Sequence, residues 1–409
     1  MYVRGVCGAV EIVFPGSSCY KPNIAHRSQP EGSSGPGTSS ALLAGALVPA
    51  FERQEEQFAR AFAVLREAVA TKAFPAAALA VTHRGRLVAN AAFGQFTYDP
   101  TSPAVAPASI FDLASVSKVV ATTAMAMVLY ERGLLDLETP LAGVVPEFAA
   151  GSGDKRRREV TLHQLLAHSS GLPAYEKLFL EAQTPEALLR ASFDTPLSAD
   201  PGSRAEYSDI GFIILGVALE RLADESLDRF CRREIFGPLG MAHTAFSPPQ
   251  TWRAQIPPTV DDTTFRKRAI QGEVHDENAS VLGGVAGHAG VFAPASDVAV
   301  FAHAMLSGGA PLVRPETLAL FTRREAAPAG TSRALGWDTP SSPSQSGKYF
   351  SAGSYGHLGY TGTSLWIDPA RGLSVVLLTN RTWPDCGNKA ISEVRPRVHD
   401  AVVEALEGR

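Results

Sequence analysis

Apolar residues recur along the chain with two different periods, and the longer period comes first. Between residues 51 and 72 the spacing is near 3.6, which predicts an amphipathic helix that ends before Pro75. The residues that set this period are Phe51, Phe58, Phe62, Leu65 and Val69.

Short apolar runs of strand character lie near both ends of the chain. Residues 77–81 and 87–93 flank a turn at His83-Arg84-Gly85, which predicts a hairpin. Far along the chain, two more apolar runs at 363–367 and 373–379 are joined by a short polar segment. These four runs are the predicted strands.

Helical patterns fill the middle of the chain. Thr161 and Gln164 form a capping-box pattern that opens one helix. Strands at both ends with helices between them favour an α+β fold, with an antiparallel sheet built from N- and C-terminal segments, flanked by helices, and a mostly helical lobe inserted. The other predicted helices span residues 115–132, 209–223, 226–236, 296–306 and about 388–407.

The first 50 residues differ from the rest because Gly, Ser and Pro dominate them. We expect residues 1–50 to be a disordered extension or a start assigned too early, followed by one domain over 51–409. Its α/β lobe would comprise about 51–114 and 285–409, and its helical lobe about 115–284. The start shows no basic segment followed by an apolar core, so the chain as written reads as cytoplasmic, but as periplasmic or secreted if the start is wrong.

Composition, charge and cysteine count limit the kinds of binding partner that we expect. Apolar residues make up 45% and charged residues 19%, which is typical of a globular protein, and no apolar run is long enough to span a bilayer. The net charge of −4 gives no reason to expect nucleic acid or an anionic membrane. The four cysteines are scattered, so we expect reduced thiols and neither a zinc site nor a disulfide framework. The sequence does not indicate an oligomeric state.

Ser115 and Lys118 carry the first candidate chemistry. They stand three positions apart where a turn becomes an apolar helix, so both fall on one helix face. A lysine amine within hydrogen-bond reach can act as the base that a serine nucleophile needs. The helix N-terminus adds unpaired N–H groups that favour negative charge on oxygen.

The same spacing occurs a second time, at Ser152 and Lys155. Glycines and the basic run 156–158 surround this copy, and no apolar period supports a helix there. We interpret it as a solvated loop. The pattern alone therefore carries little weight, and Ser115 depends on its companions.

Two further segments supply candidate companions. Tyr207 precedes an apolar helix and could relay a proton, provided that nearby lysine charge eases its ionisation; alternatively it packs at a helix start with its hydroxyl in water. His357 and Gly359 precede a strand whose backbone could offer an N–H to an oxyanion; alternatively this glycine-rich flank is a turn with a structural histidine.

In order and spacing, Ser115-x-x-Lys118, Tyr207-x-Asp209 and His357-x-Gly359 resemble the serine penicillin-recognising superfamily, and within it the class C β-lactamase-like group, which includes D-Ala-D-Ala peptidases and family VIII esterases. The segments 161–173, 284–292 and 359–369 are similar to that group as well, so the resemblance covers roughly residues 55–405. It implies a β-lactamase/transpeptidase-like fold and no cofactor. It also implies that Ser115 is the nucleophile, Lys118 the base and Tyr207 the proton relay, with backbone N–H groups of Ser115 and Tyr360 as the oxyanion hole.

Two positions depart from the group. Asp209 replaces the usual Asn, and an ionised carboxylate cannot donate to a substrate carbonyl. His357 replaces the lysine of β-lactamases, and a histidine near its ordinary pKa is mostly neutral at pH 7. Both changes favour an ester or amide substrate without an obligatory carboxylate.

Three hypotheses of function remain. The first is a serine hydrolase that acts through an acyl-enzyme on small-molecule or peptide-like esters or amides, as an esterase or a D-Ala-D-Ala carboxypeptidase, with a class C-like β-lactamase as an alternative. The second is a catalytically weak penicillin-binding or sensing module. The third is a metal-dependent hydrolase using His275, Asp276 and Glu277, although consecutive loop residues seldom converge on one ion, which favours a hydrogen-bonded loop beside the active site and no metal.

Overall fold

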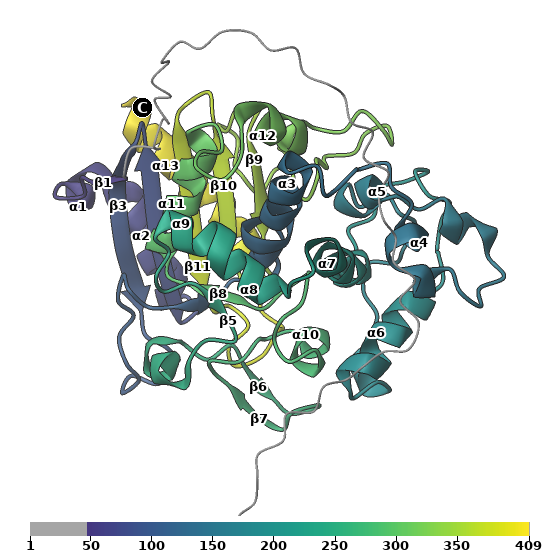
Figure 1. The fold of residues 1–409 in the computed structure, drawn as a ribbon. Coiled ribbons are helices and arrows are strands. Elements are labelled where there is room, and N and C mark those ends of the chain that lie inside the picture. Colours follow the sequence, from purple (N-terminus) through teal and green to yellow (C-terminus); the bar gives the residue numbers. More distant parts are fainter. Residues whose placement is uncertain (1–46, 409) are drawn as a thin grey trace, which may run out of the picture. The chain divides into compact units, whose positions relative to one another are not determined.

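A computed structural model describes residues 47–408, and its centre is a six-stranded sheet (Figure 1). The strand order is β1-β3-β2-β11-β10-β9, with β1 parallel to β3 and every other pair antiparallel. N- and C-terminal segments meet at β2 and β11, so the sheet predicted from both ends of the chain is confirmed. Its strands are β1 (Val48–Pro49), β2 (Ala76–His83), β3 (Arg86–Gly94), β9 (Tyr355–Leu358), β10 (Ser364–Asp368) and β11 (Leu373–Thr379).

Helices cover both faces of this sheet. On β2, Ala76, Ala78 and Ala80 face one hydrophobic cluster, whereas the intervening Ala77, Leu79 and Val81 face another. This alternation is the period of a strand, and here both faces are buried, so β2 reads as a continuous apolar run. The second cluster lies under α2 (Ala59–Ala70) and α13 (Ile391–Glu407), and the first under α11 (Ala295–Leu306) and the helical lobe.

The segment between β4 and β8 is mostly helical, and α4, α5, α6 and α7 lie on the right in Figure 1. Short strands also occur, in the three-stranded sheet β4-β8-β5 and the hairpin β6-β7. The strand bounds are β4 (Phe111–Asp112), β5 (Ala245–Phe246), β6 (Val260–Asp262), β7 (Arg268–Ile270) and β8 (Val291–Ala293). The α-helices are α3 (Ala124–Glu131), α4 (Leu141–Val144), α5 (Leu162–Leu166), α6 (Pro185–Asp194), α7 (Asp209–Ala223), α8 (Leu227–Cys231), α9 (Gly237–Leu239), α10 (Glu277–Val281) and α12 (Pro315–Thr322).

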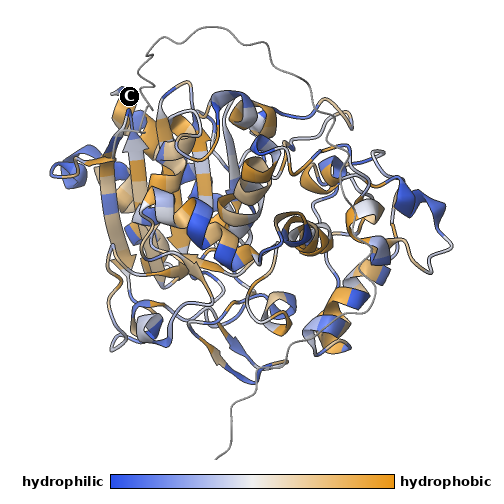
Figure 2. Cartoon of the chain, in the orientation of Figure 1, coloured by the Kyte–Doolittle hydropathy of each residue, from blue (hydrophilic) through white to orange (hydrophobic). Residues whose placement is uncertain are grey.

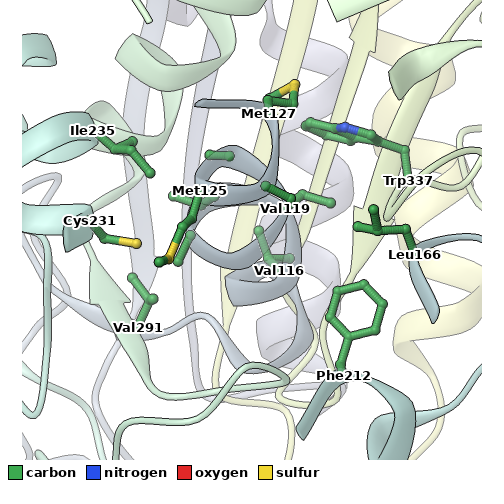
Figure 3. Packing of buried hydrophobic residues seen from close by; sticks show 14 of the residues in the cluster. Val116, Val119, Met125, Met127, Leu166, Phe212, Cys231, Ile235, Val291 and Trp337 are labelled. Carbon is green, nitrogen blue, oxygen red and sulfur yellow. The ribbon is translucent and has the colours of Figure 1, made fainter. Parts of the chain in front are cut away.

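The helix that follows Ser115 runs through the largest hydrophobic cluster. Figure 3 shows Val116, Val119, Met125 and Met127 on it, with side chains from other elements around them. Helix α7 is hydrophobic along most of its length in Figure 2, which agrees with the burial of most of its residues. The two helices that frame the candidate site are thus held by core packing.

Most predicted elements are present, but the helix predicted over 226–236 is α8 followed by a π-helical stretch (Arg232–Phe236), and the start of the chain differs as well. The helix predicted over 51–72 is divided into α1 (Gln54–Gln57) and α2, because Phe58 takes a non-helical conformation while its ring is fully buried. Strand β1 occupies residues 48–49; the rest of the predicted extension, residues 1–46, lies outside the described residues. Within the described range, none of the helices combines the length and apolar character needed to cross a bilayer.

Close backbone packing joins α7 to the segment that leads into β8. A Cβ added at Gly287 would overlap the carbonyl oxygen of Phe212, and one at Gly216 would lie 3.0 Å from the Gly287 backbone. Glycine is therefore required on both sides of this contact.

Substituting Gly287→Ala should lower the free energy of unfolding by about 1–3 kcal/mol, because overpacking forces α7 away from this segment. Gly143→Ala is the matched control, since a Cβ there meets nothing within 4 Å and Gly143 lies in α4. Urea unfolding of both variants checks this expectation. Equal stability of the two variants would contradict the packing described here.

Candidate active site

Ser115 stands on a strained turn directly after β4. It lies in a 3₁₀ turn (Ala114–Val116) and is followed by a π-helical stretch (Lys118–Thr123) and then α3, where the sequence predicted one regular helix. Ala114 adopts a φ of 47°, which is costly for a residue with a Cβ. The predicted proximity is present, because Lys118 Nζ lies 3.0 Å from Ser115 Oγ.

Lys118 is completely buried, and its ammonium group donates to three acceptors. Besides Ser115 Oγ, these are Asp209 Oδ1 at 2.6 Å and the carbonyl oxygen of His288 at 2.8 Å. Burial lowers the pKa of Lys118, whereas the adjacent Asp209 carboxylate raises it, and the net direction is downward. The neutral form of the Lys118 amine is therefore more favoured in this site than it would be in water.

Tyr207 and Asp209 reach the site because α7 begins between them. Ser208 is the N-cap of α7, and its hydroxyl accepts a hydrogen bond from Gly211 N at 2.9 Å. Burial, followed by the Asp209 charge, raises the pKa of Tyr207 well above its usual range, while a hydrogen bond with Ser115 lowers it. Lys118 Nζ lies 4.9 Å from the centroid of the Tyr207 ring, so a lysine is near as the relay requires, but the net direction of the pKa of Tyr207 is upward and favours the protonated phenol.

His168 supports this turn and was missed by the sequence analysis. Its Nδ1 accepts a hydrogen bond from Ser208 N at 3.1 Å, and its ring lies 4.7 Å from the Tyr207 ring and 4.8 Å from the Phe212 ring. Burial lowers the pKa of His168 well below its usual range, so it is neutral. Two signals in the sequence were available, the capping box at Thr161, which opens the helix that ends just before His168, and the similarity of segment 161–173 to the group.

The opposite wall is the end of the edge strand β9, which carries His357. His357 Nδ1 lies 2.8 Å from the carbonyl oxygen of Leu358, and burial holds the pKa of His357 well below its usual range. The ring is thus a neutral imidazole, as predicted for pH 7. Its centroid lies 5.8 Å from that of Tyr207.

Two threonine hydroxyls fasten this wall to the Ser115 turn. Thr361 Oγ1 donates to the carbonyl oxygen of Asp112 at 2.9 Å, and Thr363 Oγ1 donates to that of Leu113 at 2.8 Å. A Cβ at Gly359 would overlap both Thr363 Oγ1 and the Leu113 carbonyl, which explains the glycine. The two threonine hydrogen bonds fix the distance between the turn that carries Ser115 and the turn that carries Tyr360, whose side chain is exposed.

The His275–Glu277 segment is held to the site by hydrogen bonds. Asp276 Oδ1 lies 2.7 Å from His288 Nε2 and caps α10, and the His288 carbonyl in turn accepts from Lys118. His288 lowers the pKa of Asp276 to about 2 in spite of burial. Among residues 47–408, no three His, Cys, Asp or Glu side chains are grouped so that they could hold a metal ion.

These elements enclose a cavity of about 810 Å³. Its lining includes six of the predicted site residues, Ser115, Tyr207, Asp209, His357, Gly359 and Tyr360, and it also includes arginines that the sequence analysis missed, Arg333, Arg381 and Arg395. The second serine–lysine pair is elsewhere, with Ser152 and Lys155 exposed on a loop and a short 3₁₀ turn, as predicted.

Comparison with known families identifies the class of protein. A family model described as Beta-lactamase matches residues 61–394, so the chain belongs to this family, within the serine β-lactamase and transpeptidase superfamily, and the resemblance seen in the sequence is confirmed. The family consists of hydrolases, as the sequence predicted.

Curated relatives of this chain include proteins named as an amidase and as a carboxypeptidase. An N-acetylmuramyl-L-alanine amidase of Bacillus subtilis (strain 168) is 33% identical over 345 residues, 75% of this chain and 77% of the relative. A protein of Salmonella agona (strain SL483) named "Putative D-alanyl-D-alanine carboxypeptidase" is 33% identical over 317 residues, 69% and 72% of the two chains.

Solved structures share the fold. EstCE1, a hydrolase with promiscuous acyltransferase activity, aligns with a TM-score of 0.71 at 22% identity and covers 85% of this chain and 99% of its own. The simvastatin synthase LovD of Aspergillus terreus, as its LovD6 mutant, aligns with a TM-score of 0.68 at 22% identity, over 87% and 97% of the two chains. At this identity the likeness supports the α+β fold alone.

Asp112 links the Ser115 turn to the His275 segment by hydrogen bonds. Its ionisation can be tested by measuring the stability of the protein at different pH values. Its carboxylate accepts from Ala114 N at 2.8 Å and His275 N at 2.6 Å, and burial raises its pKa to about 6. A folded-state pKa above the unfolded value means that the folded protein binds the extra proton, so this contribution to stability grows as the pH falls from 7 towards 4.

Asp112→Asn removes the titrating group. The stability of the wild type relative to this variant should therefore rise on going from pH 7 to pH 4, by an amount of the order of 2 kcal/mol. Unfolding in urea at several pH values measures the difference. A difference that is constant, or that shrinks as the pH falls, would be inconsistent with the buried carboxylate.

Proposed function

We propose that the protein is a serine hydrolase that cleaves ester or amide bonds through an acyl-enzyme on Ser115. The observation that supports this most is the buried Lys118 amine, 3.0 Å from Ser115 Oγ. Burial shifts Lys118 towards the neutral form that can accept a proton, which is the condition for activating a serine.

In the acylation step, Ser115 Oγ attacks the substrate carbonyl carbon and its proton passes to Lys118. The carbonyl oxygen becomes an oxyanion, and the backbone N–H groups of Ser115 and Tyr360 are the proposed donors to it. The threonine contacts from the turn between β9 and β10 to the Ser115 turn support this pairing, because they hold the two residues at a fixed separation.

Collapse of the tetrahedral intermediate breaks the bond to the leaving group, which takes a proton from Tyr207. A phenol that stays protonated suits this role, and the raised pKa of Tyr207 keeps it protonated. Lys118 then returns the serine proton to the tyrosine oxygen. Water hydrolyses the acyl-enzyme by the same steps in reverse, which regenerates Ser115.

The names of the relatives are the basis for the proposed substrate class. Their names include an amidase and a carboxypeptidase, both of which cleave amides, so a peptide-like amide is the first candidate and an ester the second. Asp209 and the neutral His357 differ from the β-lactamase pattern, which makes β-lactam hydrolysis the weaker alternative. A weak penicillin-binding module has no need of Ser115, Lys118 and Tyr207 together.

Substitution of the nucleophile tests the proposal. We expect Ser115→Ala to lower turnover of p-nitrophenyl butyrate by about a thousandfold or more, because no other group in the cavity replaces the serine oxygen. We also expect a fluorophosphonate to add to Ser115 of the wild type, observed by mass spectrometry. Ser152→Ala is the matched control, since Ser152 carries the same motif on an exposed loop.

Several outcomes would contradict the proposal. Full turnover in Ser115→Ala would refute the nucleophile, and no adduct on Ser115 with fluorophosphonate, nitrocefin or the ester would favour a binding module. Activity that is lost on addition of EDTA would favour the metal-dependent alternative at His275, Asp276 and Glu277.

Asp209 offers a second test, through the pH profile. Its carboxylate raises the pKa of Lys118, so Asp209→Asn should lower that pKa. If the neutral amine is the base, the acidic limb of kcat/KM then moves to lower pH. Glu206→Gln, beside the same turn but paired with Arg204, is the control and should leave the limb in place. A limb that stays fixed in Asp209→Asn would exclude Lys118 as the titrating base.

A further inference from the structure

The glycine-rich segment 283–290, just before β8, supplies one of the three partners of Lys118. Four of its eight residues are glycine, and three of these glycines have φ values from 80° to 119°. Such a backbone can take many conformations unless other contacts hold it. The hydrogen bond that closes its turn, from Ala289 N to the carbonyl oxygen of Ala286, is long, at 3.4 Å. Side chains are therefore needed to fix the carbonyl oxygen of His288, which accepts from Lys118.

Two side chains from different elements hold this segment. Thr122 Oγ1 donates to the carbonyl oxygen of Gly287 at 2.6 Å. His288 Nε2 donates to Asp276 Oδ1 at 2.7 Å, because an ionised carboxylate can only accept. Thr122 is fully buried and His288 is 1% exposed, so water does not compete for either hydrogen bond. Two adjacent peptide groups are thus held from two sides.

Thr122 lies on the same helix as Lys118, four positions later, and both side chains reach this segment. Lys118 Nζ donates to the His288 carbonyl at 2.8 Å, and Thr122 donates to the carbonyl of the preceding residue. Residues four apart share one face of a helix, and the stretch Lys118–Thr123 is π-helical. The helix and the glycine-rich segment are therefore joined by two hydrogen bonds to consecutive carbonyl groups.

Asp276 gives the His288 ring a fixed anchor. Its Oδ1 caps α10 by accepting from Ala279 N at 2.8 Å. The preceding residue, His275, donates its backbone N–H to Asp112 at 2.6 Å, just before the turn that carries the nucleophile. The anchor of the His288 ring is therefore part of the same framework as the nucleophile.

The three partners of Lys118 determine where its lone pair points. A neutral amine has two N–H bonds and one lone pair. The Asp209 carboxylate and the His288 carbonyl can only accept, so they take the two N–H bonds, and the lone pair faces Ser115 Oγ at 3.0 Å. Once the amine has taken the serine proton, it donates to the same three oxygens, so the base does not have to move during the reaction. A displaced His288 carbonyl would leave one N–H free and let the lone pair turn away from the serine.

We propose that Thr122 and His288 are positioning residues, which hold two consecutive carbonyl groups and thereby direct the lone pair of Lys118 at Ser115. This inference rests on the proposed acyl-enzyme function and adds the groups that orient its base. Neither side chain takes up or delivers a proton in the reaction. Their effect passes through the backbone of the glycine-rich segment to the amine.

Two neighbouring threonines provide a matched pair of variants. Thr123 is as buried as Thr122, but its hydroxyl has no hydrogen-bond partner among the described residues. Thr122→Val should lower kcat for p-nitrophenyl butyrate by about 3- to 10-fold with KM nearly unchanged, as for loss of one buried hydrogen bond that acts on the base. Thr123→Val should leave kcat and KM within about twofold of the wild type.

The pH profile separates orientation of the base from its protonation. The charges that act on the pKa of Lys118 are those of Asp209, Asp276 and Arg333, and neither threonine variant removes one of them. The acidic limb of kcat/KM should therefore stay in place in Thr122→Val while its plateau falls.

His288 is tested by removing and restoring the donor of its ring. His288→Leu should lower kcat, and the rate of fluorophosphonate addition to Ser115, by about 10- to 100-fold, because a small shift of the carbonyl misaligns the base. His288→Gln should recover much of this loss, since its amide can donate to Asp276 in place of Nε2. His399→Leu is the control for loss of a buried histidine, because His399 is fully buried, lies 3.0 Å from the Gln345 carbonyl and does not line the cavity.

Urea unfolding of each variant reports that it is folded under the assay conditions, and the threonine pair decides the question if His288→Leu does not fold. Equal kcat in Thr122→Val and Thr123→Val would overturn the proposal. A loss in Thr122→Val that appears in KM alone would also overturn it, because it would indicate an effect on substrate binding. A wild type that hydrolyses no ester and forms no adduct on Ser115 would refute the proposed function itself.

Discussion

The buried amino group of Lys118 is the constraint on which the rest of the site depends. A polar or charged group taken out of water costs free energy unless it finds hydrogen-bond partners. Its three partners, Ser115, Asp209 and the His288 carbonyl, come from three separate segments. The start of α7, the glycine-rich segment before β8 and the turn after β4 must therefore converge on one point, and the close contact of Gly216 with Gly287 allows two of them to do so.

The central sheet contributes the other half of this arrangement. Strands from both ends of the chain pair along β2 and β11, and β9 and β10 extend that sheet towards Ser115. Thr361 and Thr363 then join the sheet to the turn that carries the serine. Neither lobe holds the complete site, which explains why residues as distant in sequence as Ser115 and His357 line one cavity.

Sequence patterns predicted the features that depend on neighbouring residues and missed those that depend on contacts between distant segments. Helix α7 has the predicted bounds because Ser208 caps its start and Asp224, in a left-handed conformation, ends it. Ser115 and Lys118 were found because residues three apart stay close even where the helix is 3₁₀ or π in character. His168 and Arg333 lie in irregular segments without a period, and only the folded chain brings them into contact with the Tyr207 ring. The break at Phe58 likewise follows from burial of its ring.

Asp338, next to the buried Trp337, forms an antiparallel bridge with Gly356 of β9 and covers an open edge of the sheet. Strand β9 is the last of the six-stranded sheet, and an open strand of this kind can pair with a second polypeptide and start aggregation. The two backbone hydrogen bonds to Asp338, together with the buried Trp337, cover the middle of that edge. The same short segment that lines the cavity with Arg333 and Asp338 therefore also protects the sheet against strand addition from outside.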